Sequence, residues 1–320
     1  MFSKILVPLD GSESAERALP YAEAIGLRLN STLILVRAAT THPLRATYPT
    51  EPAQEVMREA KEYVDGIARG LTERGVTVET AVPYAEPVEG VLSELRRWEA
   101  DLIVMSTHGR SGLGRWVYGS VAEHVLAHSP APMLLVRAWR AKAEPVSLGE
   151  QPRIVVPLDG SQFAEEALPA AAGLAEALGG ELVLLRAVNA GSANVAIDTA
   201  GLGYVLSPGP IVSELAESEV KRLTEEAEEY LSQVAPSTSR FRTEVRTGSA
   251  VEAIVEATRE HDASMVVMTT HGRTGLGRVL LGSVADGVLR QGEIPLLLVR
   301  PRTLVATHAE VGAPGDVPSW

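Results

Sequence analysis

The chain has 320 residues, of which 45% are hydrophobic, and a formal net charge of −12. This length and apolar content suffice for two packed cores, while the negative charge argues against a general affinity for nucleic acid or anionic membranes. The lack of cysteine excludes disulfides, thiolate metal sites and cysteine nucleophiles. No apolar run approaches the roughly 18 residues of a membrane span, and the N-terminus lacks the regions of a signal peptide, so we expect a soluble cytoplasmic protein.

Strands and helices alternate along the first half. The short, β-branched run Ile5–Leu9 predicts a buried parallel strand. Apolar residues at helical spacing then predict a helix over residues 15–29, with Ser12 as its N-cap. The remaining pattern predicts strands over Thr32–Val36, Val76–Val82, Leu102–Ser106 and Pro132–Val136, and helices over Glu51–Arg74, Pro87–Trp98 and Ser120–Ala127.

The second half repeats this order. Strands are predicted over Ile154–Leu158, Leu182–Leu185, Arg240–Val245, Met265–Thr269 and Pro295–Val299, and the longest helix over Val212–Val234. The sequence VPLDGS occurs at Val7–Ser12 and Val156–Ser161, a shift of 149 residues. The sequence THGR(S/T)GLGR occurs at Thr107–Arg115 and Thr270–Arg278, a shift of 163. Fourteen extra residues (163 − 149) therefore lie in the second half, and the Gly-, Ala-, Ser- and Pro-rich stretch Asn189–Pro210 is their expected place.

A repeat of about 150 residues has the size of a domain, so the chain is a duplicated domain rather than an array of short repeats. Strands alternating with helices of ten or more residues indicate right-handed crossovers and a mostly parallel sheet covered on both faces. We predict an α/β fold with domains at 1–138 and 152–302, a linker at 139–151 and a disordered tail at 303–320.

Two polar turns at strand ends carry the functional signal, because ligands of open parallel sheets bind beyond the carboxyl ends of strands. Asp10 and Asp159 each close the first strand of a half. A carboxylate there could accept hydrogen bonds from a ribose. Asp10-Gly11-Ser12 could equally be a turn with an N-cap, which requires these residue types for conformation alone.

The second turn is a glycine-rich loop followed by a helix. Residues 107–115 contain three glycines, and Gly119-Ser120 opens the next helix. Glycines let backbone N–H groups approach an anion, and a helix N-terminus adds unpaired donors, so phosphate binding is favoured. The glycines could instead only shape the loop, and Ser120 with Glu123 also fits a capping box, as Ser283 with Asp286 does less closely.

Other interpretations have less support. His108 and His271 lack a second ligand at metal-like spacing, which favours a turn or ligand-edge role over a metal site. No nucleophile elbow surrounds Ser12, which argues against a hydrolytic triad with Asp10 and His108. The chain has no Walker A loop and no G-x-G-x-x-G after a first strand. The loop arginines could meet phosphates or pair with surface carboxylates; they are Arg110, Arg115, Arg273 and Arg278.

The chain resembles the universal stress protein family in its tandem two-domain form, over roughly residues 1–138 and 152–302. The ATP-binding signature of that family is G-x2-G-x9-G-[ST] after the fourth strand. Gly109 and Gly119-Ser120 match it in the first half, and Gly272 and Gly282-Ser283 in the second. Ser106 and Thr269 stand where the signature has its first glycine, close to the expected nucleotide, where a side chain could crowd the ligand or hydrogen-bond to it.

The resemblance implies two Rossmann-like domains of the adenine nucleotide α-hydrolase-like type, each with a five-stranded sheet, and ATP binding with Mg²⁺ or Mn²⁺. It implies a ribose contact at Asp10 and Asp159, flanked by Pro8 and Pro157. Adenine would meet the backbone of Ala38 and Ala187 and the side chains of Met105 and Met268. The phosphates would lie against Gly109, Gly119, Ser120 and Val121, or in the second half Gly272, Gly282, Ser283 and Val284, with His108, Arg110, His271 and Arg273 in the same loops.

Three functions compete at this stage. A regulatory ATP-binding protein in the stress response is favoured over a slow ATPase or phosphotransferase, because the glycine loop lacks the carboxylate cluster of rapid phosphoryl transfer, and we assign no catalytic residue. The substitutions at Ser106 and Thr269 keep an interaction scaffold without nucleotide as an alternative. The family's dimer contact further implies an intramolecular pseudo-dimer through the last strands of the two halves, with a homodimer of whole chains as a further alternative.

Overall fold

A computed structural model of the chain describes residues 2–40, 51–107, 119–137, 148–188, 210–270 and 281–300, without the side chains of 51, 52 and 210–216. The predicted tail, most of the predicted linker and residues 189–209, where the fourteen extra residues were expected, lie outside the described residues.

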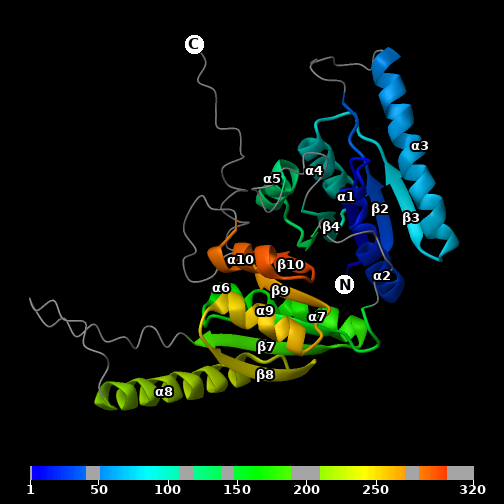
Figure 1. The fold of residues 1–320 in the computed structure, drawn as a ribbon. Helices are drawn as coiled ribbons and strands as arrows, with labels where there is room; N and C mark the ends of the chain where they lie inside the picture. The colour runs from blue at the N-terminus through cyan, green and yellow to red at the C-terminus, as the bar shows by residue number, and fades with distance from the viewer. Residues whose placement is uncertain are drawn as a thin grey trace, which may run out of the picture.

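Strands and helices alternate through the first half, as the sequence pattern predicts (Figure 1). The elements in chain order are β1 (Lys4–Pro8), α1 (Glu13–Glu16), α2 (Leu19–Leu29), β2 (Thr32–Val36), α3 (Glu51–Glu73), β3 (Thr77–Ala81), α4 (Pro87–Trp98), β4 (Leu102–Ser106), α5 (Ser120–His128) and β5 (Met133–Val136).

The same succession recurs in the second half. Its elements are β6 (Arg153–Pro157), α6 (Gln162–Glu165), α7 (Leu168–Leu178), β7 (Glu181–Val188), α8 (Pro210–Val234), β8 (Arg240–Thr247), α9 (Ala250–Glu260), β9 (Met265–Thr269), α10 (Ser283–Gln291) and β10 (Leu296–Val299). The long helices α3 and α8 lie at opposite ends of the molecule in Figure 1.

The ten strands of the described residues form one sheet in the order β3-β2-β1-β4-β5-β10-β9-β6-β7-β8. Among these strands, the pairs within each half are parallel and only the pair β5–β10 is antiparallel. Strand order reverses between β1 and β4, and again between β6 and β9, which places a topological switch point in each half. Ligands of such sheets bind beyond the carboxyl ends of the strands at this point, where both repeated motifs follow their strands.

Apolar side chains cover both faces of the sheet. One cluster packs α2, α3, α7 and α8 against one face, with Ile25, Leu71 and Leu231 among its fully buried members. The other cluster packs α4, α5, α9 and α10 against the opposite face. Each cluster contains residues of both halves, so the two cores are continuous across the strand pair β5–β10.

The junction between the halves consists of last strands and reciprocal arginine contacts. Leu296 pairs with Leu135, and Leu297 with Leu134. The Arg137 guanidinium donates to the carbonyl of Gly292, at the end of α10. The equivalent arginine, Arg300, donates at 3.5 Å to the carbonyl of Ser129, at the end of α5. Cations at helix C-termini are stabilising, so these contacts add to the apolar pairing.

The single helix predicted over residues 15–29 is wrong, because α1 and α2 are separate. Ser12 is the N-cap of α1, as predicted, and its Oγ accepts from the N–H of Ala15 at 3.2 Å. A second helix then begins at Leu19 with Pro20 in its first turn. Proline has no backbone N–H to continue a preceding helix but fits the first turn of a new one.

Strands β7 and β8 extend further than predicted. Their ladder continues past the apolar run through Arg186, which pairs with Val245, to Val188, which pairs with Thr247. Strand β8 is an edge strand, and most of its side chains are exposed or half-buried. Its stabilisation therefore depends on polar contacts as well as on apolar burial.

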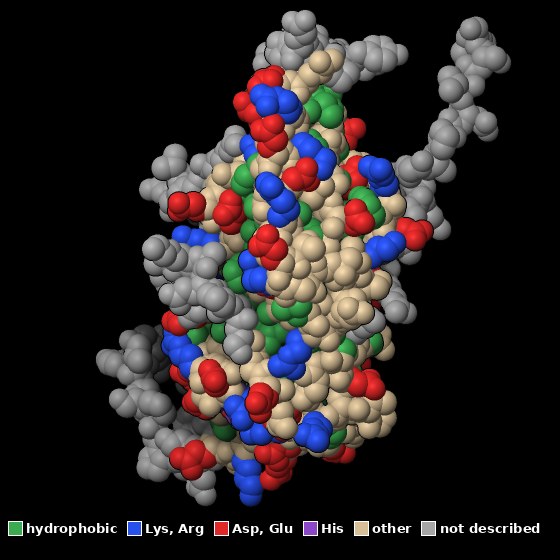
Figure 2. All heavy atoms as spheres, turned by 90° about the vertical axis from the view of Figure 1, so that its right-hand side faces the viewer, with side chains coloured by type: hydrophobic (Ala, Val, Ile, Leu, Met, Phe, Trp, Pro, Cys, Tyr) green, Lys and Arg blue, Asp and Glu red, His purple; other side chains and the backbone are tan. Residues whose placement is uncertain are grey.

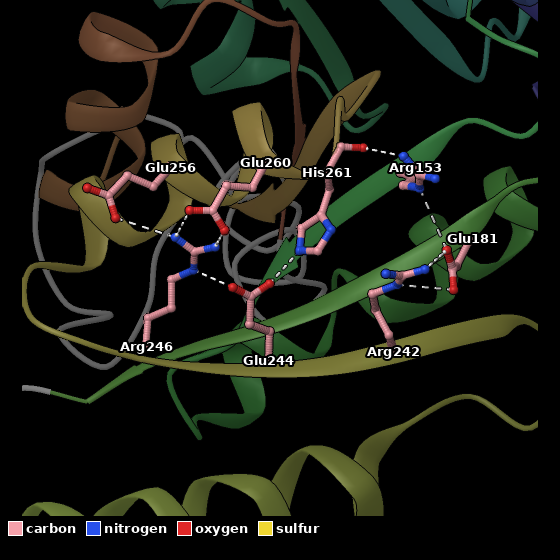
Figure 3. A network of polar contacts seen from close by, with 8 residues as sticks. All are labelled: Arg153, Glu181, Arg242, Glu244, Arg246, Glu256, Glu260 and His261. Atoms are coloured by element: carbon pink, nitrogen blue, oxygen red, sulfur yellow. Dashed lines mark hydrogen bonds and ion pairs between the residues drawn. The ribbon is translucent and has the colours of Figure 1, made fainter.

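A polar network ties β8 to the end of α9 (Figure 3). Glu244 contacts His261 Nε2 at 2.5 Å and accepts a hydrogen bond from Arg246. Arg246 also contacts Glu260, and it contacts Glu256 at 3.4 Å. Burial raises the pKa of the Glu244 carboxyl, but hydrogen bonds from His261 and Arg246 outweigh this effect and hold the pKa below its usual value. The charged form of Glu244 is therefore the one that stabilises this edge.

The face shown in Figure 2 carries interspersed charges of both signs. Along α3, opposite charges form pairs, such as Arg58 with Glu62 at 2.8 Å and Lys61 with Asp65 at 2.5 Å. A continuous basic surface of the kind that binds nucleic acid is not present on this face. Among the described residues, no helix is long and apolar enough to cross a bilayer.

Candidate functional site

The Asp-Gly-Ser turn has the same geometry in both halves. Asp10 Oδ1 accepts from the N–H and Oγ of Ser12, at 2.9 and 2.6 Å. Asp159 Oδ1 accepts from Ser161 in the same way, at 3.0 and 2.6 Å. The central residue, Gly11, has φ of +84°, which strongly favours glycine. The conformational role predicted for this turn is therefore confirmed, and it fixes the direction of the carboxylate at the end of β1 and β6.

The glycine loop returns to the strand end from which it departs. The N–H of Gly119 donates to the carbonyl of Thr107 at 2.6 Å, and that of Gly282 to Thr270 at 2.8 Å. Residues 108–118 and 271–280 lie outside the described residues. The two backbone bonds nevertheless place the starts of α5 and α10 next to the ends of β4 and β9.

The capping boxes predicted at Ser120 and Ser283 are wrong. The N-cap residues are Gly119 and Gly282, and neither α5 nor α10 has a side-chain cap in the described part of the chain. Ser120 is instead the first helical residue. Asp286, the other member of the second predicted box, accepts from Arg290 at 2.8 Å. Neither serine therefore has the capping role that would turn it away from a ligand.

Gly119 is not required by the conformation of the protein. Its φ of −72° and ψ of 161° are open to any residue, and a Cβ would meet the carbonyl of Thr107 at 3.7 Å, an ordinary contact. Serine or aspartate at an N-cap would stabilise the helix by only about a few tenths of a kcal/mol relative to glycine. Glycine is therefore an adequate N-cap here, and its lack of a side chain leaves the space beside the first N–H groups of α5 open.

A cavity of about 380 Å³ lies at the switch point of the first half. We call it the first cavity. Its size falls in the range of roughly 300–1,000 Å³ typical of small-molecule sites. It brings together eight predicted residues, namely Pro8, Asp10, Ala38, Met105, Ser106, Gly119, Ser120 and Val121. Apolar side chains from α4 and β4 share this lining with the Asp10 turn and the start of α5.

The second cavity occupies the equivalent place and is smaller, at about 250 Å³. It brings together all the predicted second-half residues that the structure describes: Pro157, Asp159, Ala187, Met268, Thr269, Gly282, Ser283 and Val284. Thr269, like Ser106, is buried. The six other predicted site residues lie outside the described residues; they are His108, Gly109, Arg110, His271, Gly272 and Arg273.

Part of the first cavity was not predicted from the sequence. Arg37 and Thr40 follow β2, and Val56, Glu59 and Ala60 come from α3. Glu59 adds a second carboxylate to that of Asp10. The periodicity of α3 shows an apolar face but not that its first turns lie over the carboxyl end of β1. Among the described residues, no group of three or more acidic or histidine side chains is arranged to hold a metal ion.

Comparison with known proteins identifies the family. The sequence profile of the universal stress protein family matches residues 1–137 and 152–300. The chain belongs to the universal stress protein family. A universal stress protein of Mycobacterium tuberculosis is 25% identical over 306 residues, which are 92% of this chain and 96% of that protein. One from Thermus aquaticus is 34% identical over 140 residues, which are 43% of this chain and the whole of that protein. The chain is thus a tandem universal stress protein, with single-domain relatives that match about half of it.

Solved structures of universal stress proteins share the fold. One from Archaeoglobus fulgidus superposes with a TM-score of 0.65 at 19% identity, covering 94% of this chain and 99% of that one. One described as a universal stress protein of Pseudomonas aeruginosa gives 0.64 at 19% identity, covering 97% of each chain. The tandem α/β architecture predicted from the sequence is confirmed by these likenesses.

Proposed function

We propose that this universal stress protein binds ATP with Mg²⁺ or Mn²⁺ and acts in the stress response through nucleotide-dependent conformation or partner binding. The observation that carries the proposal is the N-cap glycine of α5, which leaves space beside the first N–H groups of the helix at the end of a cavity. The first N–H groups of a helix have no partner within the helix itself. Those N–H groups and the positive end of the helix dipole suit a phosphate. The same arrangement begins α10.

The lining of the first cavity fits the rest of the nucleotide. Pro8, Val91 and Met105 offer an apolar environment to a base, and the Asp10 carboxylate could accept hydrogen bonds from a ribose. Magnesium bound to a nucleotide usually takes most of its ligands from phosphates and water, with one or two carboxylates. With Asp10 assigned to the ribose, Glu59 is the carboxylate that the described lining leaves for a phosphate-bound cation.

Binding of ATP is tested by calorimetry on the full chain. We expect saturable binding of MgATP with up to two sites, with the stronger site lost in Asp10→Ala and the weaker one in Asp159→Ala. Glu228→Ala, an exposed change on α8, is the matched control and should bind as the unmodified chain does. The absence of both heat and a thermal shift at millimolar ATP would contradict the proposal and favour an interaction scaffold.

A further inference from the structure

A three-residue contact lies beside the Asp-Gly-Ser turn of the first half. The guanidinium carbon of Arg37 lies 4.7 Å from the centroid of the Tyr63 ring. The hydroxyl of Tyr63 donates to Glu16 Oε1 at 2.8 Å. The three side chains come from the end of β2, from α3 and from α1, so the contact joins three elements. We call Arg37, Tyr63 and Glu16 the first clamp.

The second half contains the same contact. Arg186 lies 4.7 Å from the centroid of the Tyr230 ring, and the Tyr230 hydroxyl donates to Glu165 Oε1 at 3.0 Å. We call Arg186, Tyr230 and Glu165 the second clamp. In each half, therefore, an arginine lies over the face of a tyrosine ring, and the hydroxyl of that tyrosine donates to a glutamate.

The recurrence follows the duplication of the chain. The arginines and the glutamates are related by 149 residues (186 − 37 and 165 − 16), as the flanking motifs are. The tyrosines are related by 167 (230 − 63) and hold the same place in a repeated helix segment, which reads EAKEY at residues 59–63 and EAEEY at residues 226–230. The strands that follow, β3 and β8, are related by 163 (240 − 77), so the chain between the tyrosine and the strand is four residues shorter in the second half. The contact is therefore kept in both halves although the chain around it differs in length.

Each clamp contacts the turn that carries the carboxylate. Glu16 ends α1, whose N-cap Ser12 is bonded to Asp10. In the second half, a Cβ on Gly160 would lie 3.2 Å from the Arg186 guanidinium, so the arginine packs on the turn backbone. Burial and Glu16 raise the pKa of Tyr63, and the charge of Asp10 raises it further while that of Arg37 lowers it. Both charges are thus close to the ring.

We propose that Arg37 and Arg186 are positioning residues for ligand binding: each is held flat by its tyrosine, supports the Asp-Gly-Ser turn, and fixes the carboxylate of Asp10 or Asp159 to receive ribose hydroxyls. This inference rests on the proposed nucleotide function. A guanidinium suits the role because its plane stacks on an aromatic face, whereas a lysine ammonium keeps the charge without the plane. Arg37 also lines the first cavity, so a direct contact with phosphate is the competing explanation.

The test compares two ligands and two conservative variants in the full chain carrying Asp159→Ala. Arg37→Lys keeps the charge and Tyr63→Phe keeps the ring. We expect each variant to weaken ATP binding about tenfold, the size of one charge-assisted hydrogen bond. Binding of 2′,3′-dideoxy-ATP, which lacks the hydroxyls that Asp10 would receive, should not change. An equal loss for both ligands, or no loss for ATP, overturns the proposal, because a general structural defect or a phosphate contact would affect both. Arg186→Lys and Tyr230→Phe in an Asp10→Ala chain provide the same comparison in the second half.

A measurement without ligand separates this proposal from the proposed function. Amide hydrogen exchange reports the bond from Ser12 N–H to Asp10. We expect the Ser12 amide to exchange several-fold faster in Arg37→Lys and Tyr63→Phe, while the buried amides of β2 keep their rates. If the unmodified chain binds no nucleotide but Ser12 exchange rises in this way, the proposed function fails and the clamp stands as a support of the turn. Unchanged exchange at Ser12 overturns the clamp whatever the chain binds.

Discussion

The contact between β5 and β10 should hold the two halves together without a covalent connection. Its pairs are antiparallel and apolar, and Leu297 is 1% exposed. We expect a chain cut by a specific protease at a site introduced within residues 140–146 to remain one particle at micromolar concentration. A cut chain that stays together would support the pseudo-dimer that the family resemblance implies.

The effect of weakening this contact follows from the position of Leu297. Truncating a fully buried leucine to alanine costs about 2–5 kcal/mol. Leu297 pairs with Leu134 across the junction and with Val267 within its own half. If the loss divides evenly between these two sides, about 1–2.5 kcal/mol appears in the association of the halves. At about 1.4 kcal/mol per tenfold change, Leu297→Ala should raise the dissociation constant of the cut chain roughly five- to sixtyfold.

Sedimentation velocity on the cut chain measures this constant. Leu184→Ala is the matched control, because Leu184 is equally buried but lies on β7, away from the junction. It should lower the stability of the second half to unfolding and leave the dissociation constant unchanged. The reasoning is refuted if the cut, unmodified chain separates into halves at micromolar concentration, or if the two variants release the halves equally.

Three further predictions concern the site and the β8 edge. Gly119→Val should abolish ATP binding at the first site in calorimetry with little change in melting temperature, because the added methyl groups would fill ligand space rather than strain the backbone. Ser106→Gly and Thr269→Gly restore the family signature, and we expect the threonine change to tighten binding more, since its cavity is smaller. Glu244→Gln should lower the free energy of unfolding by about 2 kcal/mol at pH 6, the value of a hydrogen bond to a charged group, and this loss should become smaller as the pH falls toward 3.

The sign of the last effect follows from the lowered pKa of Glu244. A carboxyl with a lower pKa in the folded state stabilises the fold above its unfolded pKa of about 4.3 and loses this effect as the pH falls through the folded value. Urea unfolding between pH 3 and 6 measures it. If the difference in unfolding free energy between the unmodified chain and Glu244→Gln does not shrink on acidification, the charged form of Glu244 does not stabilise this edge.

The Gly119→Val variant is tested in a chain that also carries Asp159→Ala. If that chain still binds ATP as tightly as Asp159→Ala alone, the assignment of the phosphates to Gly119 is wrong.

Most of the fold could be predicted from the sequence, because buried parallel strands are short apolar runs. The prediction for Leu102–Ser106 matches β4 residue for residue. The errors have local physical causes. Apolar periodicity continues across Arg17 and Ala18, so it does not show that Pro20 starts a new helix. The apolar run of β7 ends at Leu185, but the ladder with β8 continues because backbone pairing does not require apolar side chains.

The candidate site was predictable where it follows strands and unpredictable where it depends on helix placement. Both strand-end motifs lie beside a cavity, as their positions indicate. The contribution of Glu59 and the stacking of Arg37 on Tyr63 depend on how α3 crosses the sheet. The capping box at Ser120 failed because its residue pattern does not distinguish an N-cap from the first helical residue, and the glycine before it takes the cap.

The two halves agree at the carboxyl ends of their strands and differ at their outer edges. Glu244 belongs to a charged network in the second half. The equivalent residue of the first half, 163 positions earlier, is Ala81, which is buried and apolar. The turns, the N-cap glycines and the clamps are the same in both halves although the connection before α8 differs. Features that only stabilise an edge are free to differ between the halves, because either solution keeps the edge folded. Features that would meet one ligand are not free to differ, because the ligand would set their geometry. We therefore expect the function at the shared strand ends rather than at the edges.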